Sequence, residues 1–96
     1  MVKKINYNYV FVFYDVKEKR VNKVFKIGKK YLSHFQKSVF RGEMTPSKLI
    51  MFKNDLNKVI DDEQDFICII KLMNNSVFGE EILGSKNNDT GEDLII

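Results

Sequence analysis

Hydrophobic side chains occupy both faces of the first extended segment, residues 7–16. This segment is rich in β-branched and aromatic residues, which favour strands, and the side chains of a strand alternate between its two faces. Alternation separates two apolar sets: Tyr9, Phe11 and Phe13 on one face, and Val10, Val12 and Tyr14 on the other. A strand that is apolar on both faces is expected to be covered on both.

Residues 17–32 have the period of a helix with two stripes. The apolar stripe consists of Val21, Val24, Phe25 and Leu32, with Gly28 on the same line. The cationic stripe consists of Lys19, Lys23, Lys26 and Lys30. Aligned cations repel one another unless an anion neutralises them, so we expect this stripe to contact phosphates of a nucleic acid; solvated lysines are the alternative.

A second helix is predicted to begin with Thr45 as its N-cap and Pro46 as its first helical residue. Its buried side is expected to carry Leu49, Phe52, Leu56 and either Val59 or Ile60. The acidic run that follows, residues 61–65, is expected to be a solvated turn.

Three further segments are predicted to be extended: residues 34–42, 66–72 and 77–83. Residues 34–42 form either one bent strand or a hairpin that turns near Lys37 and Ser38. The segment 66–72 is again apolar on both faces, with Phe66, Cys68 and Ile70 opposing Ile67 and Ile69.

This order of elements predicts an α+β fold of the ferredoxin-like, split βαβ kind, an antiparallel sheet with two helices on one face. Residues 1–84 are expected to form this domain, and residues 85–96 a flexible linker with an apolar tip, "DLII". Because two helices cover only one face of the sheet, the other apolar face is expected to pack against an identical sheet in a homodimer. The tip is expected to dock on the partner subunit or another protein.

Charge is distributed unevenly along the 96 residues. Residues 1–53 carry a net charge of +10 and residues 54–96 a net charge of −7, which favours a basic surface for a polyanion. The sequence has no apolar run long enough to span a membrane. No signal peptide is expected, because the first residues lack an apolar h-region ahead of a small-residue cleavage site. A single cysteine, Cys68, cannot form an internal disulfide, which is typical of a cytoplasmic protein.

Asp15 is the one carboxylate in the first strand, on the parity of Phe11 and Phe13. One interpretation is that it caps the helix that follows or closes the turn before it. The other is that it binds a divalent metal ion, because Mg²⁺ is typically held by one or two carboxylates with waters and phosphate oxygens. A two-fold axis near the strand would supply a second copy of Asp15.

Other polar residues give weaker signals. His34, the only histidine, has no partner for a zinc site and is expected at a strand edge. Cys68 is expected to pack rather than react. Ser38 suits a turn or a phosphate oxygen, and Tyr14 and Phe40 suit packing or base stacking.

Four segments together resemble the CRISPR-associated Cas two family: "VFYDV", the "KR" that opens the first helix, "FQKSVFRGEMTPSKL" and "DFICIIKL". The resemblance runs from about Tyr9 to Leu83. It implies a ferredoxin-like homodimer whose last strand pairs with the partner's sheet. Such dimers bridge Cas one integrase dimers and bind double-stranded protospacer DNA during spacer acquisition.

Some members of this family are metal-dependent endonucleases that act on single-stranded RNA or double-stranded DNA. The resemblance implies that Asp15 is the ligand of Mg²⁺ or Mn²⁺ and that Tyr14, Arg20, Ser38 and Phe40 belong to the same site. Arg41 stands where many members have an acid. Two alternatives remain open: a stand-alone toxin-type ribonuclease of the VapD kind, and a non-catalytic RNA-binding module.

Overall fold

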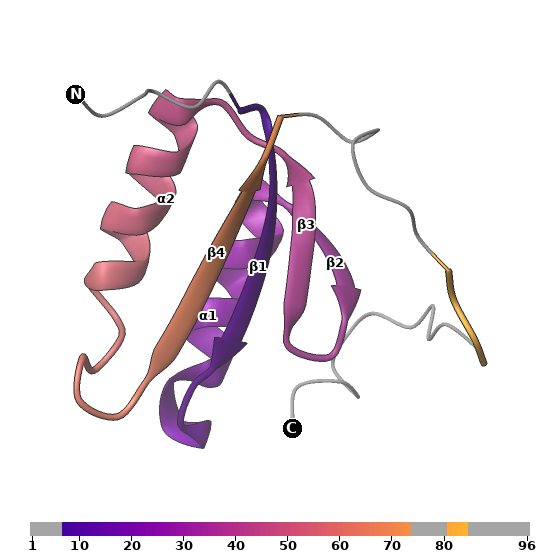
Figure 1. Cartoon of the computed structure of the whole chain (residues 1–96). Helices are drawn as coiled ribbons and strands as arrows, with labels where there is room; N and C mark the ends of the chain where they lie inside the picture. The colour runs from indigo at the N-terminus through magenta and orange to yellow at the C-terminus, as the bar shows by residue number, and fades with distance from the viewer. Residues whose placement is uncertain (1–6, 74–80, 85–96) are drawn as a thin grey trace.

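The structure, a computed structural model, describes residues 7–73 and 81–84. Its elements in chain order are β1 (Tyr9–Asp15), α1 (Glu18–Tyr31), β2 (Ser33–Gln36), β3 (Val39–Glu43), α2 (Pro46–Asn57) and β4 (Phe66–Leu72) (Figure 1). The predicted strand 77–83 lies partly outside the described residues, and residues 81–83 are not in a strand. The predicted linker and apolar tip also lie outside them.

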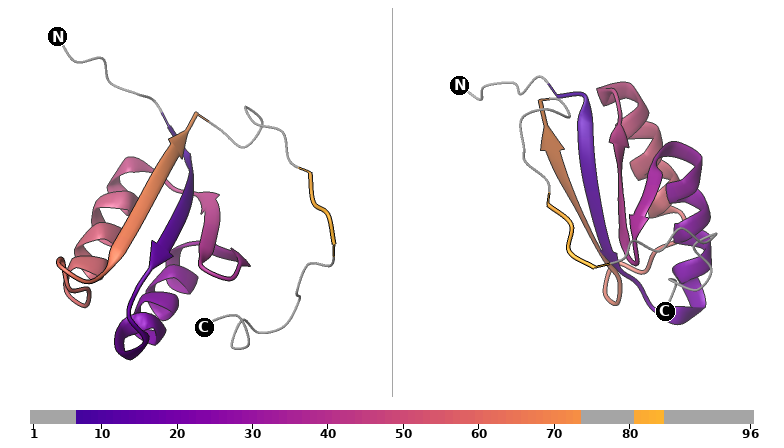
Figure 2. Two further views of the ribbon diagram at one scale, coloured as in Figure 1. Left: turned by 60° about the horizontal axis from the view of Figure 1, so that its bottom comes forward. Right: turned by 90° about the vertical axis from the view of Figure 1, so that its right-hand side faces the viewer.

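The four strands form one antiparallel sheet in the order β2-β3-β1-β4. Both helices lie on the same face of this sheet, and an edge-on view shows the two layers (Figure 2). The predicted ferredoxin-like arrangement is therefore confirmed. Within the described part of the chain, no helix has the length and apolar character needed to cross a membrane.

The core lies between the sheet and the helices. Its buried side chains are Val10, Val12, Tyr14, Val24, Phe25, Leu32, Phe40, Met44, Leu49, Phe52 and Leu56. α1 and β3 approach each other closely at Gly28, over which the Phe40 ring lies. A Cβ atom added to Gly28 would lie 2.3 Å from the Phe40 ring, so the missing side chain of Gly28 makes room for this ring.

The segment 34–42 is a hairpin rather than one bent strand. β2 and β3 pair from Ser33 opposite Arg41 to Gln36 opposite Val39, with an irregularity between His34 and Gln36. Lys37 and Ser38 form the turn, and Lys37 has a positive φ of 40°.

The second helix begins as the sequence predicts. Thr45 is its N-cap and accepts a hydrogen bond through Oγ1 from the backbone N–H of Lys48 at 3.3 Å, and Pro46 is the first helical residue. A side-chain cap of this kind satisfies one of the otherwise unpaired N–H groups of the first turn. The N-cap of α1, Lys17, makes no such side-chain bond.

Candidate nucleic-acid and metal site

The face of the sheet that no helix covers is apolar. Because directly opposed residues of an antiparallel pair share a face, it carries Tyr9, Phe11, Phe13 and Asp15 from β1, Val39, Arg41 and Glu43 from β3, and Phe66, Cys68, Ile70 and Leu72 from β4. We call this set the open face. Phe13 is 39% exposed, Ile70 45% and Phe66 62%. Exposure of such a continuous apolar surface indicates a binding surface.

Asp15 ends β1 on the open face, as its parity predicts. It lies opposite Phe66 of β4, and its residue is exposed. Within residues 7–73 and 81–84, the side chain of Asp15 makes no ion pair, and no group of three or more His, Cys, Asp or Glu side chains could hold a metal ion. One chain therefore offers a metal a single carboxylate.

The capping role considered for Asp15 belongs instead to Asp65. Asp65 Oδ1 accepts the backbone N–H of Lys17, the N-cap of α1, at 2.9 Å. Its side chain has no exposed surface, so the prediction of a solvated turn is wrong at this residue, whereas residues 62–64 are exposed. The sequence signal for this role was weak, because Asp65 is one of four acids in a polar run.

Arg20 is paired with Asp65 through its Nε and Nη2 groups. Its Nε donates to Asp65 Oδ2 at 2.5 Å and its Nη2 donates to Asp65 Oδ1 at 3.0 Å and to Gln64 Oε1 at 3.2 Å. The hydrogen bonds from Arg20 hold the pKa of the Asp65 carboxyl well below its usual range. The same bonds raise the pKa of Arg20, so this pair is charged at every physiological pH.

Tyr14 and Phe40 lie in the core, on the opposite face of the sheet from Asp15. They are 5% and 1% exposed, and their rings stack with centroids 5.7 Å apart. The Tyr14 hydroxyl donates to the carbonyl of Lys37 at 3.5 Å, and burial raises the pKa of Tyr14 to about 12. Neither ring is accessible to a nucleic-acid base, so the structure does not support the stacking considered for them.

Ser38 lies in the hairpin turn beside the end of β1. Its carbonyl accepts the backbone N–H of Tyr14 at 3.1 Å. His34, whose Nε2 lies 2.7 Å from the carbonyl of Lys37, packs its ring against Phe25 and Phe40. The structure thus brings the hairpin turn next to the strand that carries Asp15, while the His34 ring lies on the helix side.

The four lysines of the cationic stripe are exposed along α1. Lys30 differs from the other three lysines because its Nζ lies 3.6 Å from Asp55 Oδ2. Asp55 also accepts the hydroxyl of Tyr31 at 2.7 Å. In the described part of the chain, Lys19, Lys23 and Lys26 have no ion-pair partner and present their full charge to solvent.

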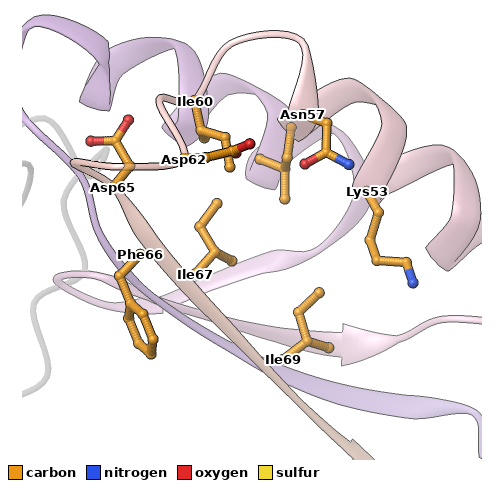
Figure 3. Close-up of a pocket in the computed structure, with 9 residues that line it drawn as sticks. Lys53, Asn57, Ile60, Asp62, Asp65, Phe66, Ile67 and Ile69 are labelled. Atoms are coloured by element: carbon orange, nitrogen blue, oxygen red, sulfur yellow. The ribbon is translucent and has the colours of Figure 1, made fainter.

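A pocket of about 280 Å³ lies between α2, the loop that follows it and β4. Ile60, Ile67 and Ile69 form part of its lining, and Lys53 and Asn57 extend from α2 at its margin (Figure 3). The pocket lies on the helix side of β4, whereas Asp15 lies on the open face. It therefore does not include the candidate metal site.

Comparison with known proteins gives one consistent result. The family model described as CRISPR associated protein Cas2 matches residues 8–79. The "CRISPR-associated endoribonuclease Cas2 3" of Thermodesulfovibrio yellowstonii is 45% identical over 86 residues, covering 90% of this chain and 98% of the relative. The "CRISPR-associated endoribonuclease Cas2" of Thermotoga maritima is 39% identical over 83 residues, covering 86% and 95%. A solved crystal structure of cas2 aligns with a TM-score of 0.77 at 31% identity, covering 86% of this chain and 93% of the other.

Proposed function

Because this chain belongs to the CRISPR associated protein Cas2 family, we propose that it acts in CRISPR spacer acquisition as a homodimer that binds double-stranded protospacer DNA. In this role it bridges dimers of the Cas one integrase. The observation that carries the DNA-binding proposal is the row of unpaired lysines on α1, described above.

The open face supports the proposed homodimer. A second copy of the same surface, related by a two-fold axis, would cover the exposed rings of Phe13 and Phe66 and the side chain of Ile70. A last strand within residues 77–83 that pairs with the partner's sheet would add to this interface. The predicted docking of the apolar tip, residues 93–96, on the partner or on the integrase belongs to the same proposal.

The lysine row suits a protein that must accept any spacer sequence. Lysine side chains neutralise phosphates without reading bases, so they supply affinity that does not depend on sequence. Lys19, Lys23 and Lys26 are exposed on a single helix face. Since α1 lies on the side of the sheet away from the open face (Figure 2), dimerisation through the open face leaves this row accessible.

The test is the salt dependence of duplex DNA binding. Replacing Lys19, Lys23 and Lys26 by Gln should weaken binding equally for unrelated sequences and flatten the slope of log K against log salt by roughly 0.9 for each lost contact. The matched control replaces three exposed lysines of α2 and its C-cap, Lys48, Lys53 and Lys58, by Gln. This control removes the same charge, so an equal change in slope in both variants would contradict the proposal.

A second candidate function is metal-dependent endonuclease activity on RNA or DNA. It is favoured by the place of Asp15 on the open face and by the relatives that are named endoribonucleases. In the proposed homodimer, the Asp15 carboxylates of both chains would hold Mg²⁺ or Mn²⁺, which fits the preference of Mg²⁺ for few carboxylates and several waters. A cation held there supplies charge that stabilises the anionic phosphate during hydrolysis.

The contribution of this chain's own residues to cleavage is mainly to hold the cation and to orient the nucleic acid. Two carboxylates at an interface repel each other, so without a cation they destabilise the dimer. The open face contains no histidine, because the ring of His34 packs on the helix side. A protein base for water is therefore not evident among the described residues.

Asp15→Asn tests this second function. The substitution keeps the shape of the side chain and removes its charge, so it should abolish metal-dependent cleavage of labelled RNA and duplex DNA while the dimer and DNA binding persist. Parallel reactions with a chelator identify the fraction of the cleavage that depends on metal. Equal cleavage by the wild type and the variant would show that Asp15 is not a metal ligand. Growth arrest on expression without partner proteins would instead favour the toxin-type ribonuclease. A monomer in light scattering would favour the RNA-binding module.

A further inference from the structure

The carboxylate of Asp65 connects three segments at one end of the sheet. Oδ1 accepts the backbone N–H of Lys17 at 2.9 Å, and Oδ2 accepts the backbone N–H of Asp61 at 2.8 Å. Arg20, in the first turn of α1, donates to both oxygens. The side chain of Asp65 has no exposed surface and that of Arg20 is 15% exposed, so the connection is shielded from solvent. A charged pair of this geometry is stronger than a neutral hydrogen bond.

These contacts hold two backbone segments that neighbour Asp15, one along the chain and one across the β1–β4 pairing. Phe66, which follows Asp65 directly, lies opposite Asp15 in the β1–β4 pairing. Lys17, whose N–H is bound by Asp65, is two residues beyond Asp15. The side chain of Asp15 itself has no ion-pair partner within residues 7–73 and 81–84. Its place is therefore set by the backbone that carries it.

We infer that Asp65 is a positioning residue for Asp15, and that Arg20 acts through Asp65 rather than through contact with nucleic acid. This inference rests on the proposed metal-binding role of Asp15. It changes the assignment of Arg20, which the family resemblance places among the site residues. The Arg20 guanidinium directs Nε and Nη2 to Asp65 and Gln64, and these contacts point to an indirect effect of Arg20 on the site.

A purely structural role is the alternative, because removing one member of a shielded ion pair destabilises a fold wherever the pair lies. Asp55 provides the matched comparison. It also joins two elements, since it accepts the Tyr31 hydroxyl of α1 at 2.7 Å and lies 3.6 Å from Lys30 Nζ. Its contacts are to the C-terminal turn of α1, at the opposite end of that helix from Lys17 and Arg20.

The experiment measures Mn²⁺ binding to the full-length homodimer by electron paramagnetic resonance titration, and exchange of the Lys17 amide by NMR. Asp65→Asn and Arg20→Gln should each weaken Mn²⁺ binding by about 10-fold or more, the loss typical when a residue that orients a metal ligand is changed. The Lys17 amide should exchange faster in both. Asp55→Asn should lower thermal stability and leave both Mn²⁺ binding and Lys17 exchange unchanged. Asp15→Asn should abolish Mn²⁺ binding and leave Lys17 exchange unchanged.

Arg20→Gln also distinguishes action of Arg20 through Asp65 from direct contact of Arg20 with phosphate. If Arg20 acts through Asp65, the salt slope of duplex DNA binding should match that of the wild type. A slope reduced as much as by loss of one stripe lysine would overturn the inference, because it would show direct phosphate contact. Should Asp65→Asn not fold, Arg20→Lys keeps the charge but loses the two-pronged contact, and it should weaken Mn²⁺ binding in the same direction.

Two failures are distinguishable. If the wild type binds Mn²⁺ and Asp65→Asn binds it equally well, or if Asp55→Asn weakens binding to the same extent, the positioning role is wrong and the metal site stands. If the wild-type homodimer binds no Mn²⁺, the proposed metal-binding function itself is wrong and the positioning role falls with it.

Discussion

The two faces of the sheet are built from the same kinds of side chain but have different surroundings. On the helix side, Val10, Val12 and Tyr14 of β1 are 0%, 2% and 5% exposed. On the open face, Phe13 of the same strand is 39% exposed. Both faces have aromatic contacts: Tyr14 stacks on Phe40 at 5.7 Å, and Phe11 stacks on Phe13 at 6.3 Å between ring centroids.

The difference shows that hydrophobicity alone does not tell which partner covers a surface. The helix side of the sheet is covered by the chain's own helices, with Phe40 packed over Gly28 and against Phe25. The open face has aromatic rings in contact with each other and with solvent. A face of this kind gains stability only when a second molecule covers it. The two faces should therefore respond differently to the same substitution.

The largest expected difference is between the effects of the same substitution at two adjacent residues of β1. Val12→Glu places a charge in the closed core, so it should lower the free energy of unfolding by more than about 4 kcal/mol and prevent folding. Phe13→Glu places the same charge on the open face, so the chain should fold and fail to dimerise. Circular dichroism measures the first effect, and light scattering at low micromolar concentration measures the second.

The wild type is the reference for this pair and should scatter as a dimer. Particles of the mass of a single chain, 11.3 kDa, in the wild type would contradict the homodimer. A folded Val12→Glu variant with native stability would contradict the assignment of Val12 to the core.

A smaller loss of stability is expected at Gly28, which lies directly under the Phe40 ring. In Gly28→Ala the new Cβ would meet the Phe40 ring at 2.3–2.6 Å, and overpacking of this kind typically costs about 1–3 kcal/mol. Because an overlap at 2.3 Å is severe, we expect a cost in the upper part of this range, which exceeds the gain of about 1 kcal/mol in helix propensity from Gly to Ala. Urea unfolding measures the change.

Asn22→Ala on the exposed side of α1 is the matched control, because it raises helix propensity without a clash. Adding Phe40→Leu to Gly28→Ala should recover part of the lost stability if the ring is the obstacle. A Gly28→Ala variant more stable than the wild type would show that the ring moves aside freely.

The last expected effect is confined to alkaline pH and concerns Tyr14. Burial raises its pKa to about 12 in the folded chain, whereas an unfolded tyrosine has a pKa of about 10. The folded state therefore holds this proton to higher pH, and its contribution to stability should be lost as the pH rises from about 10 through about 12. Urea unfolding at pH values across this range measures the loss of stability, and Tyr14→Phe should remove the part of the loss that is due to Tyr14. An identical alkaline loss in Tyr14→Phe would assign it to other groups.

The fold could be predicted from the sequence because periodicity and capping act locally. Thr45 and Pro46 marked the start of α2, and the line through Val24, Phe25 and Gly28 marked the buried side of α1. The choice between a bent strand and a hairpin could not be made in the same way. It depends on the positive φ of Lys37, and lysine is not a residue type that predicts a positive φ.

The site could be predicted only in part. The parity of Asp15 placed it correctly on the face of Phe11 and Phe13. The importance of Asp65 was missed, because its partners Lys17 and Arg20 are 48 and 45 residues away in the chain. Local pattern carries no information on such a pairing. Tyr14 and Phe40 were grouped with Asp15 by family resemblance, but alternation along β1 already separates Tyr14 from Asp15.

The two-sided apolar character of β1 has a consequence for strand register. A slip of one residue would exchange the two faces, and hydrophobic pattern would oppose it only weakly, since both faces are apolar. Asp15 distinguishes the correct register from the slipped one. In a slipped ladder its carboxylate would turn under the helices, where an unpaired charge is costly. Asp15 thus also marks the correct alignment of the strands during folding, whether or not a metal ion ever reaches it.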